Sequence, residues 1–214
     1  MANLDRLYDA VVSGDDAAAR DITAQALAEG VDALTLVDQH MSPAMAEVGR
    51  RFEAGDYFVP ELLLSARAMK AGLELVRPLL AAQGAEPAGR VAIGTVEGDL
   101  HDIGKNLVSA MLEGAGFEVV DLGVNVKPEA FVEVVREKSV NVLCMSALLT
   151  TTMLAMRRAV EAVDQAGLRG RVKILVGGAP VTPQFAAEIG ADGSGENAVA
   201  AVAVAREALG LAAA

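Results

Sequence analysis

The sequence predicts an α/β fold in two parts, a helical bundle followed by a mainly parallel five-stranded sheet. The first eighty residues show helical periodicity and almost no strand signal, whereas beyond residue 90 short apolar strands alternate with amphipathic helices. Between these patterns lies AAQGAEPAGR, residues 81–90, whose small and polar composition with Gly and Pro is typical of an interdomain linker. We therefore expect a helical domain at 1–80 and an α/β domain at 91–214.

The N-terminal part predicts several helices joined by short loops, as in an antiparallel bundle. Ser13-Gly14 ends the first helix, and Asp15 or Asp16 can cap the second. Pro43 and Pro60 are favoured in a first helical turn, and the helix after Pro60 has an apolar stripe that includes Leu62 and Met69. The expected helices span Leu4–Val12, 16–28, Asp32–Gln39, a segment from Pro43, and Pro60 to about Leu75.

Beyond the linker, repeated strand–helix units imply a parallel sheet with helices on both faces. Five strands favour the flavodoxin/Rossmann-like order 2-1-3-4-5, whose ligand crevice lies beyond the carboxyl ends of strands 1 and 3. The expected strands are Val91–Gly94, Glu118–Asp121, Val140–Met145, Lys173–Val176 and a short one near Asp192. The expected helices are Gly104–Ala115, Pro128–Glu137, Thr151–Gln165, Pro183–Ile189 and Asn197–Leu209.

Composition excludes several classes of protein. The net charge of −11 argues against a nucleic-acid partner, because phosphate backbones are bound by clustered Lys and Arg. Cys144 is the only cysteine, so no intramolecular disulfide is expected; it lies in an expected strand as a small core residue. The N-terminus shows no signal peptide, and the apolar stretch at 140–156 is interrupted by Asn141, Ser146 and three threonines. We expect a cytoplasmic protein with no membrane partner.

The loop EGDLHDIGKN at residues 97–106 holds one of only two histidines and follows the first expected strand. Its glycines resemble a phosphate-binding loop, but five residues separate Gly98 from Gly104 where that motif has four. No G-x-G-x-x-G or G-x-S-x-G motif is present, and an ordinary zinc site needs three or four ligands. The plainest alternative makes His101 a surface residue, with Asp99 and Asp102 capping the next helix.

A metal inside a macrocycle would explain a single histidine better. If the macrocycle supplies four equatorial nitrogens, the protein needs to contribute only one axial ligand. Asp99 could accept a hydrogen bond from one ring nitrogen of His101 and leave the other nitrogen free for the metal.

Motifs at three strand ends carry a family resemblance. Asp99-x-His101-x-x-Gly104 matches the D-x-H-x-x-G signature of cobalamin-binding domains, and the S-x-L motif and paired glycine follow strands 3 and 4 as Ser146-Ala147-Leu148 and Gly177-Gly178. The segment RRFEAGDYFVPELLLSARAMK, residues 50–70, is similar to the helical cap of these proteins. From about Leu4 to Leu209 the chain thus resembles small corrinoid proteins of methyltransferase systems and the cobalamin-binding module of methionine synthase.

The resemblance implies that His101 is the lower axial ligand of cobalt, in place of the cofactor's own dimethylbenzimidazole. Asp99 and Thr152 would complete a relay with His101, and Asp99 could share a proton with the imidazole as the ligand leaves. Other cofactor contacts in this loop would come from the motif residues Gly98, Leu100, Asp102, Ile103 and Gly104.

For the remaining contacts, the resemblance implies that Ser146 bonds the benzimidazole, with Leu148 and Thr150 nearby. It also implies that Gly177 and Gly178 allow close approach of the nucleotide tail, and that Ala198 lies at a tail-contacting position. Phe52 and Val59 match positions that cover the upper face of cobalt. The alternatives are ordinary ones: Ser146 and Thr150–Thr152 as helix caps, the glycine pair as a plain turn, and Phe52 and Val59 as bundle core.

The function implied is that of a methyl carrier with methylcobalamin or a related corrinoid as cofactor. It would shuttle a methyl group from a substrate-specific methyltransferase to a second methyltransferase, with tetrahydrofolate or coenzyme M as acceptor. It would therefore be a component of a multi-protein methyltransferase rather than a complete enzyme, with a reductive activase as a further partner. The alternative is a cobalamin-dependent sensor or regulator without its own output domain. A mutase subunit is disfavoured by the helical cap.

Overall fold

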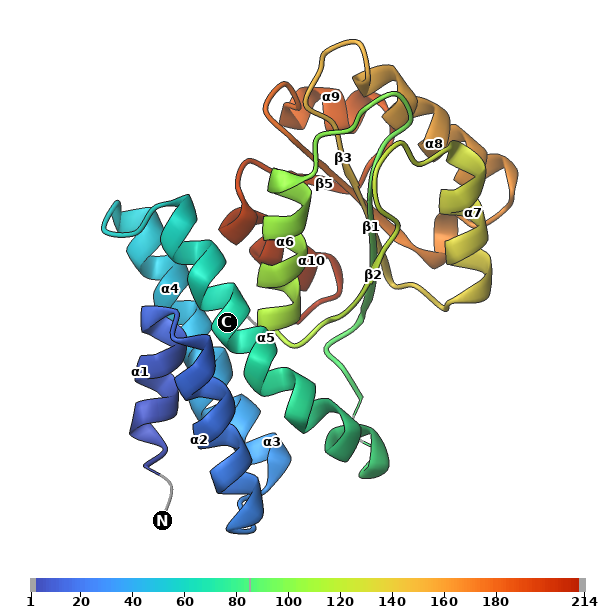
Figure 1. Ribbon diagram of the computed structural model, residues 1–214. Helices are drawn as coiled ribbons and strands as arrows, with labels where there is room; N and C mark the ends of the chain where they lie inside the picture. Colours follow the sequence, from blue (N-terminus) through green and yellow to red (C-terminus); the bar gives the residue numbers. More distant parts are fainter. Residues whose placement is uncertain (1–2, 85, 212–214) are drawn as a thin grey trace. The chain divides into compact units, whose positions relative to one another are not determined.

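Five helices and one π-helical turn form the N-terminal part of the computed structural model, which describes residues 3–84 and 86–211 (Figure 1). Gly14, with φ +76°, ends the first helix, and the Asp15 carboxylate accepts a hydrogen bond from Ala18 N–H at 2.9 Å to cap the second. The elements are α1 (Asp5–Ser13), α2 (Asp16–Ala28), α3 (Ala33–Leu36), η1 (Val37–Met41), α4 (Ser42–Ala54) and α5 (Val59–Ala82).

Helix α5 is the central element of this bundle. Its predicted apolar stripe is confirmed, since Leu62 and Met69 are buried, and the helix packs against α1 and α2. The helix continues to Ala82, beyond the predicted end near Leu75, although Pro78 inside it cannot donate a backbone hydrogen bond. Packing is close at Gly72, where an added Cβ would lie 2.5 Å from Met41 Cε.

The C-terminal part contains a five-stranded, all-parallel sheet in the order β2-β1-β3-β4-β5, as predicted. Helices α7 and α8 lie on one side of this sheet, and α6 and α10 lie on the other (Figure 1). The strands are β1 (Arg90–Thr95), β2 (Glu118–Asp121), β3 (Val142–Ser146), β4 (Lys173–Gly177) and β5 (Gly193–Gly195). The helices are α6 (Ile103–Gly114), α7 (Pro128–Glu137), α8 (Met153–Gln165), α9 (Pro183–Glu188) and α10 (Ala198–Ala208), with a short 3₁₀ turn η2 (Arg169–Arg171).

The edge strand β5 consists of Gly193, Ser194 and Gly195, a composition that hardly resembles a strand. A Cβ at Gly195 would lie 2.8 Å from Ala201 Cα, and one at Gly193 would lie 2.9 Å from Val204 Cγ1. Helix α10 therefore packs directly on the backbone of β5, which leaves no room for side chains at these two positions.

Two compact units result from this arrangement. One comprises the described residues up to 88 together with 110–116, and the other comprises 89–109 together with 117–211. The second half of α6 thus groups with the helical unit, so the division is not a single cut in the linker. No described helix has the length and the apolar character that a membrane crossing requires.

Strand register brings the motif-bearing loops to one edge of the sheet. Thr95 pairs with Ser146 at the ends of β1 and β3, and Ser146 pairs with Gly177 at the end of β4. Because parallel strands share direction, the loops after β1, β3 and β4 all leave from the carboxyl edge.

Candidate functional site

The loop between β1 and α6 presents His101 to solvent. The buried Thr95 hydroxyl donates a hydrogen bond to the carbonyl of His101 at 2.9 Å. The main-chain N–H of His101 donates to Asp99 Oδ1 at 3.0 Å, and its ring Nδ1 lies 2.7 Å from the same oxygen. Backbone and ring are therefore both fixed, while the side chain remains 53% exposed.

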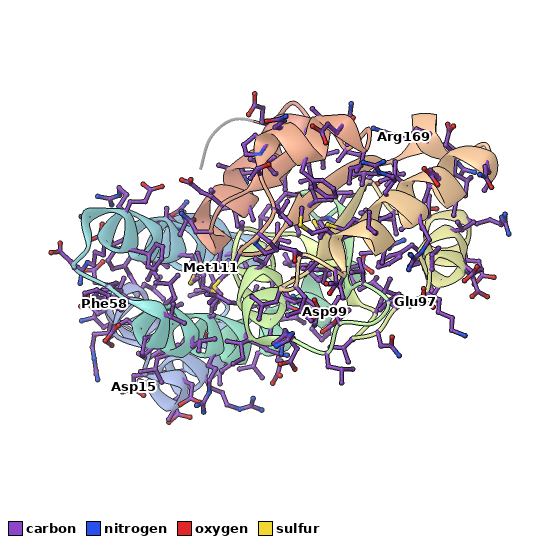
Figure 2. All side chains as sticks on the ribbon, turned by 90° about the horizontal axis from the view of Figure 1, so that it is seen from above. Asp15, Phe58, Glu97, Asp99, Met111 and Arg169 are labelled. Carbon is purple, nitrogen blue, oxygen red and sulfur yellow. The ribbon has the colours of Figure 1, made fainter. Side chains whose placement is uncertain are left out.

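Asp99 is buried inside the sheet unit, where its position is labelled in Figure 2. Its second oxygen, Oδ2, accepts a hydrogen bond from Leu148 N–H at 2.8 Å. The Thr152 hydroxyl lies 2.7 Å from Oδ2 and 2.8 Å from the Leu149 carbonyl. Since a hydroxyl has one proton, Thr152 donates to one of these oxygens at a time, and the charged one is the stronger acceptor. The loop after β3 thus positions the Asp99 carboxylate, which in turn orients the His101 ring.

These contacts decide the charge of the pair. Burial is the largest single influence on Asp99 and raises its pKa, but hydrogen bonds from Leu148 N–H, His101 and the Thr152 hydroxyl together outweigh burial and hold the pKa well below its usual range. Asp99 is therefore ionised at neutral pH. A carboxylate can only accept, so neutral His101 carries its proton on Nδ1. Within residues 3–84 and 86–211 no hydrogen bond reaches Nε2, whose lone pair is free to bind a metal.

Ser146 has a hydroxyl without a hydrogen-bond partner among the described residues, and Gly104 borders open space. The Ser146 side chain at the end of β3 is half-buried, and its hydroxyl makes no hydrogen bond to the described residues. No heavy atom lies within 4 Å of a Cβ built on Gly104. Gly98 differs, because a Cβ there would make ordinary contact with Thr152 at 3.6 Å; its φ of +83° is what favours glycine.

The glycine pair at the end of β4 lies close to the protein's own backbone, and at Gly178 that approach requires glycine. A Cβ on Gly178 would lie 1.9 Å from the Ala147 carbonyl oxygen, and its φ is +124°. A Cβ on Gly177 would lie 3.2 Å from the Gly195 carbonyl oxygen. The sequence resemblance attributed both glycines to a nucleotide tail, whereas the structure gives an additional reason that involves no ligand.

Several large apolar side chains near His101 in the sequence or in the loop after β3 are exposed. Leu100, beside His101, and Ile103, the first residue of α6, are 71% and 70% exposed, and Leu148 in the loop after β3 is 44% exposed. Val124, Leu149 and Leu154 are also exposed. Leu100, Ile103 and Leu148 follow β1 and β3 at the carboxyl edge of the sheet, and exposed apolar groups there indicate a surface that binds an apolar face.

The other predicted site residues take more ordinary places. The Asp102 carbonyl accepts a hydrogen bond from Asn106 N–H at 2.7 Å, and its Oδ2 accepts one from Asn106 Nδ2 at 3.1 Å, so Asp102 supports the start of α6. Thr150 is exposed, and Ala198 is buried in the first turn of α10.

Phe52 and Val59 belong to the helical unit. Phe52 lies half-buried on α4, and Val59 is the exposed first residue of α5. Its neighbour Phe58, labelled in Figure 2, is 64% exposed and was not among the predicted site residues.

Lys105 is a residue whose role the sequence alone did not reveal. Its side chain is buried, and Nζ lies 2.6 Å from both Asp121 Oδ2 and Asn106 Oδ1. The lysine that makes the loop resemble a phosphate-binding motif is therefore neutralised by the end of β2. A lysine in an otherwise apolar helix face was the available signal.

A conventional metal site is not formed. The described residues contain no cluster of three or more His, Cys, Asp or Glu side chains that could hold a metal ion. Cys144 is a core residue as predicted, and burial raises the pKa of its thiol to about 12. His101 is thus suited to a metal whose other ligands come from elsewhere.

Comparisons with known proteins show the family to which the chain belongs. Two family models, each described as a B12 binding domain, match residues 89–203 and 4–77. The chain is 43% identical to trimethylamine corrinoid protein 1 of Methanosarcina mazei, covering 98% of this chain and 100% of the relative. It is 42% identical to dimethylamine corrinoid protein 3 of Methanosarcina acetivorans, covering 96% of each.

Solved structures show the same likeness. A cobalamin-binding protein from Desulfitobacterium hafniense matches with a TM-score of 0.78 and 31% identity, covering 97% of this chain and 99% of that one. The methanol:cobalamin methyltransferase complex of Methanosarcina barkeri matches with a TM-score of 0.85 and 30% identity, covering 95% of this chain and 78% of that one. The chain therefore belongs to the B12-binding corrinoid proteins of methyltransferase systems, and its cofactor is a corrinoid.

Proposed function

We propose that this protein is a corrinoid methyl carrier in which His101 replaces the cofactor's own base as the lower ligand of cobalt. The observation that carries the proposal is the state of the imidazole: Nδ1 is tied to a buried, ionised carboxylate, and Nε2 is exposed without a partner in the described chain. This is the tautomer that coordinates a metal through Nε2.

The residues present fit a corrinoid. When bound, the cofactor supplies a cobalt centre that can hold and give up a methyl group. Leu100, Ile103 and Leu148 offer apolar contacts to a large ring, and the space beside Gly104 admits a displaced nucleotide tail. The unpaired Ser146 hydroxyl can bond a benzimidazole nitrogen.

Asp99 controls the proton on the imidazole. Because the Asp99 carboxylate accepts several hydrogen bonds, its pKa is lowered and it does not readily take up a proton. If Nε2 were released from a bound metal and took up a proton, the proton would stay on the ring and the imidazolium would remain paired with Asp99. This refines the shared-proton expectation, since the carboxylate stabilises the charge without accepting it.

The relatives favour a methylated amine as the source of the methyl group. Two of them are named for trimethylamine and dimethylamine, and a structural relative is part of a methanol:cobalamin methyltransferase complex. We therefore infer that a substrate-specific methyltransferase loads this carrier and that a second methyltransferase unloads it to tetrahydrofolate or coenzyme M. A reductive activase and the contacts of Phe52 and Val59 with the cofactor rest on the family resemblance.

Electron paramagnetic resonance of the reconstituted Co(II) protein tests the ligand. With ¹⁵N-labelled histidine, we expect the nitrogen splitting to change to that of one ¹⁵N nucleus, and His101→Ala to abolish the histidine signal. The matched control is His40→Ala, which removes the other histidine and should leave the spectrum unchanged. A spectrum that is insensitive to histidine labelling would show that benzimidazole is still attached and would reject the proposal.

A further inference from the structure

The segment after β2 bulges away from β1 beside the histidine loop. Thr95 N–H donates to the Gly123 carbonyl at 3.0 Å, and Val126 N–H donates to the Thr95 carbonyl at 2.9 Å. Both flanks of the bulge thus bond the same residue of β1, and Val124 and Asn125 are left outside the ladder. Pairing resumes at the bridge between Val96 and Val126.

Asn125, at the tip of this bulge, binds the histidine loop through both its side chain and its backbone. Gly98 N–H donates to Asn125 Oδ1 at 2.8 Å. Asn125 N–H donates to the carbonyl of Asp99 at 3.0 Å. The main chain of Asp99 is therefore held by the loop after β2, whereas its carboxylate is held by the loop after β3.

The backbone at position 125 restricts which residue can act in this way. Asn125 has φ +54°, in the left-handed region that Gly, Asn and Asp adopt most readily. Of these three, glycine has no side-chain acceptor for Gly98 N–H. Strain and hydrogen bonding together therefore call for Asn or Asp.

We propose that Asn125 is a positioning residue for His101. By fixing the main chain on either side of the Gly98–Asp99 peptide, it keeps the Asp99 carboxylate within reach of Nδ1 and so keeps the proton on that nitrogen. If Asn125 is removed, Asp99 shifts and a larger fraction of His101 carries its proton on Nε2, where it blocks metal binding. The inference rests on the proposed function, but the change in the tautomer ratio of His101 can be measured in the protein without cofactor.

Imidazole tautomers in the full-length apoprotein provide the first test. We would record ¹⁵N spectra of the histidine rings at a pH above the imidazole titration, with His40 as an internal reference. Asn125→Gly removes the acceptor but suits the backbone, and we expect it to lower the ratio of Nδ1–H to Nε2–H tautomer at His101 by about two- to twelve-fold, the effect of one neutral hydrogen bond. Asn125→Asp retains the acceptor and should remain close to the wild type.

Two controls separate positioning from general loosening of the fold. Val124→Ala alters the same bulge without touching the loop contacts, and it should leave the tautomer ratio unchanged. Thermal unfolding of each variant reports on stability independently. An unchanged ratio in Asn125→Gly, or an equal change in Asn125→Asp, would overturn the proposal, because the side-chain acceptor would then have no influence on His101.

The Co(II) spectrum of the reconstituted protein provides the second test. We expect the ratio of histidine-ligated to unligated cobalt in Asn125→Gly to fall by the same factor as the tautomer ratio. If the His101 tautomer ratio shifts in Asn125→Gly, but cobalt in the wild-type protein is still bound by the cofactor's own base, then Asn125 positions His101 and the proposed function fails. If wild-type cobalt binds His101 and Asn125→Gly changes neither measurement, the proposed function stands and the positioning role fails.

Discussion

The helical unit and the sheet unit bury polar side chains in different ways. Among its described residues the helical unit buries two hydroxyls, and each donates to a nearby carbonyl: Thr23 to Ala19 at 2.7 Å and Ser65 to Val12 at 3.0 Å. The sheet unit buries Thr95, Asp99, Lys105 and Thr152, which include two charged groups. Thr95 ends β1, Asp99 and Thr152 lie in the loops after β1 and β3, and Lys105 in the first turn of α6 pairs with Asp121 at the end of β2. The costly burial is therefore confined to the edge that holds His101.

Truncation of the buried carboxylate should produce the largest effect. In Asp99→Ala, the main-chain N–H groups of His101 and Leu148, the His101 ring and the Thr152 hydroxyl all lose their acceptor. We expect the free energy of unfolding of the apoprotein to fall by about 3–5 kcal/mol. Ser65→Ala, the matched change in the helical unit, should cost about 1 kcal/mol, because it removes a single neutral hydrogen bond and the Val12 carbonyl still accepts one from the Tyr57 hydroxyl at 3.1 Å. Urea titration measures both. Equal losses would remove the distinction between the two units.

The Lys105–Asp121 pair should respond asymmetrically to mutation. Lys105 is buried, whereas the Asp121 side chain is 44% exposed and can be solvated when its partner is lost. Asp121→Ala leaves the buried ammonium with only the neutral Asn106 oxygen, and we expect it to cost about 3 kcal/mol. Lys105→Met should cost about half as much. Urea titration of both variants measures the losses in free energy of unfolding. A larger loss for Lys105→Met than for Asp121→Ala would contradict the conclusion that Lys105 is the buried partner of the pair.

Acid should weaken the sheet unit first. The pKa of Asp99 is lower in the folded protein than in the unfolded chain, so the unfolded state binds the proton preferentially. The stabilisation is complete above the ordinary carboxyl pKa of about 4 and is lost as the pH falls toward the folded-state value. Hydrogen exchange measured by mass spectrometry between pH 5 and 3 should show residues 96–102 losing protection before α2 and α5. In Asp99→Asn this pH dependence should flatten.

Alkylation of Cys144 should show the smallest effect, and its rate reports on opening of the sheet unit. Burial raises its thiol pKa to about 12, so the native protein contains almost no thiolate at neutral pH. Alkylation should therefore proceed only as fast as the sheet unit opens, and it should accelerate in Asp99→Ala. Rapid labelling of the wild type would show that β3 is more accessible than its burial implies.

The sequence was informative where structure depends on local pattern. Strand order, helix positions and the relation between Asp99 and His101 follow from periodicity and from a short motif, and the fold class is confirmed. It was less informative where structure depends on distant contacts. Nothing in the chain around Asn125 indicates that its amide reaches Gly98, and β5 is set by close packing of α10 rather than by strand propensity. The extension of α5 past Pro78 likewise overrides a local signal.

Gly178 connects the far side of the site to the histidine. Any side chain there would displace the Ala147 carbonyl, and the N–H of the same peptide group, that of Leu148, is a donor to Asp99. A mutational scan scored by cofactor colour should therefore find position 178 as intolerant as the histidine loop itself, even though the glycine makes no bond to imidazole or carboxylate. Positions that are sensitive to mutation would then include residues whose replacement displaces the backbone around Asp99, as well as the residues that contact the metal.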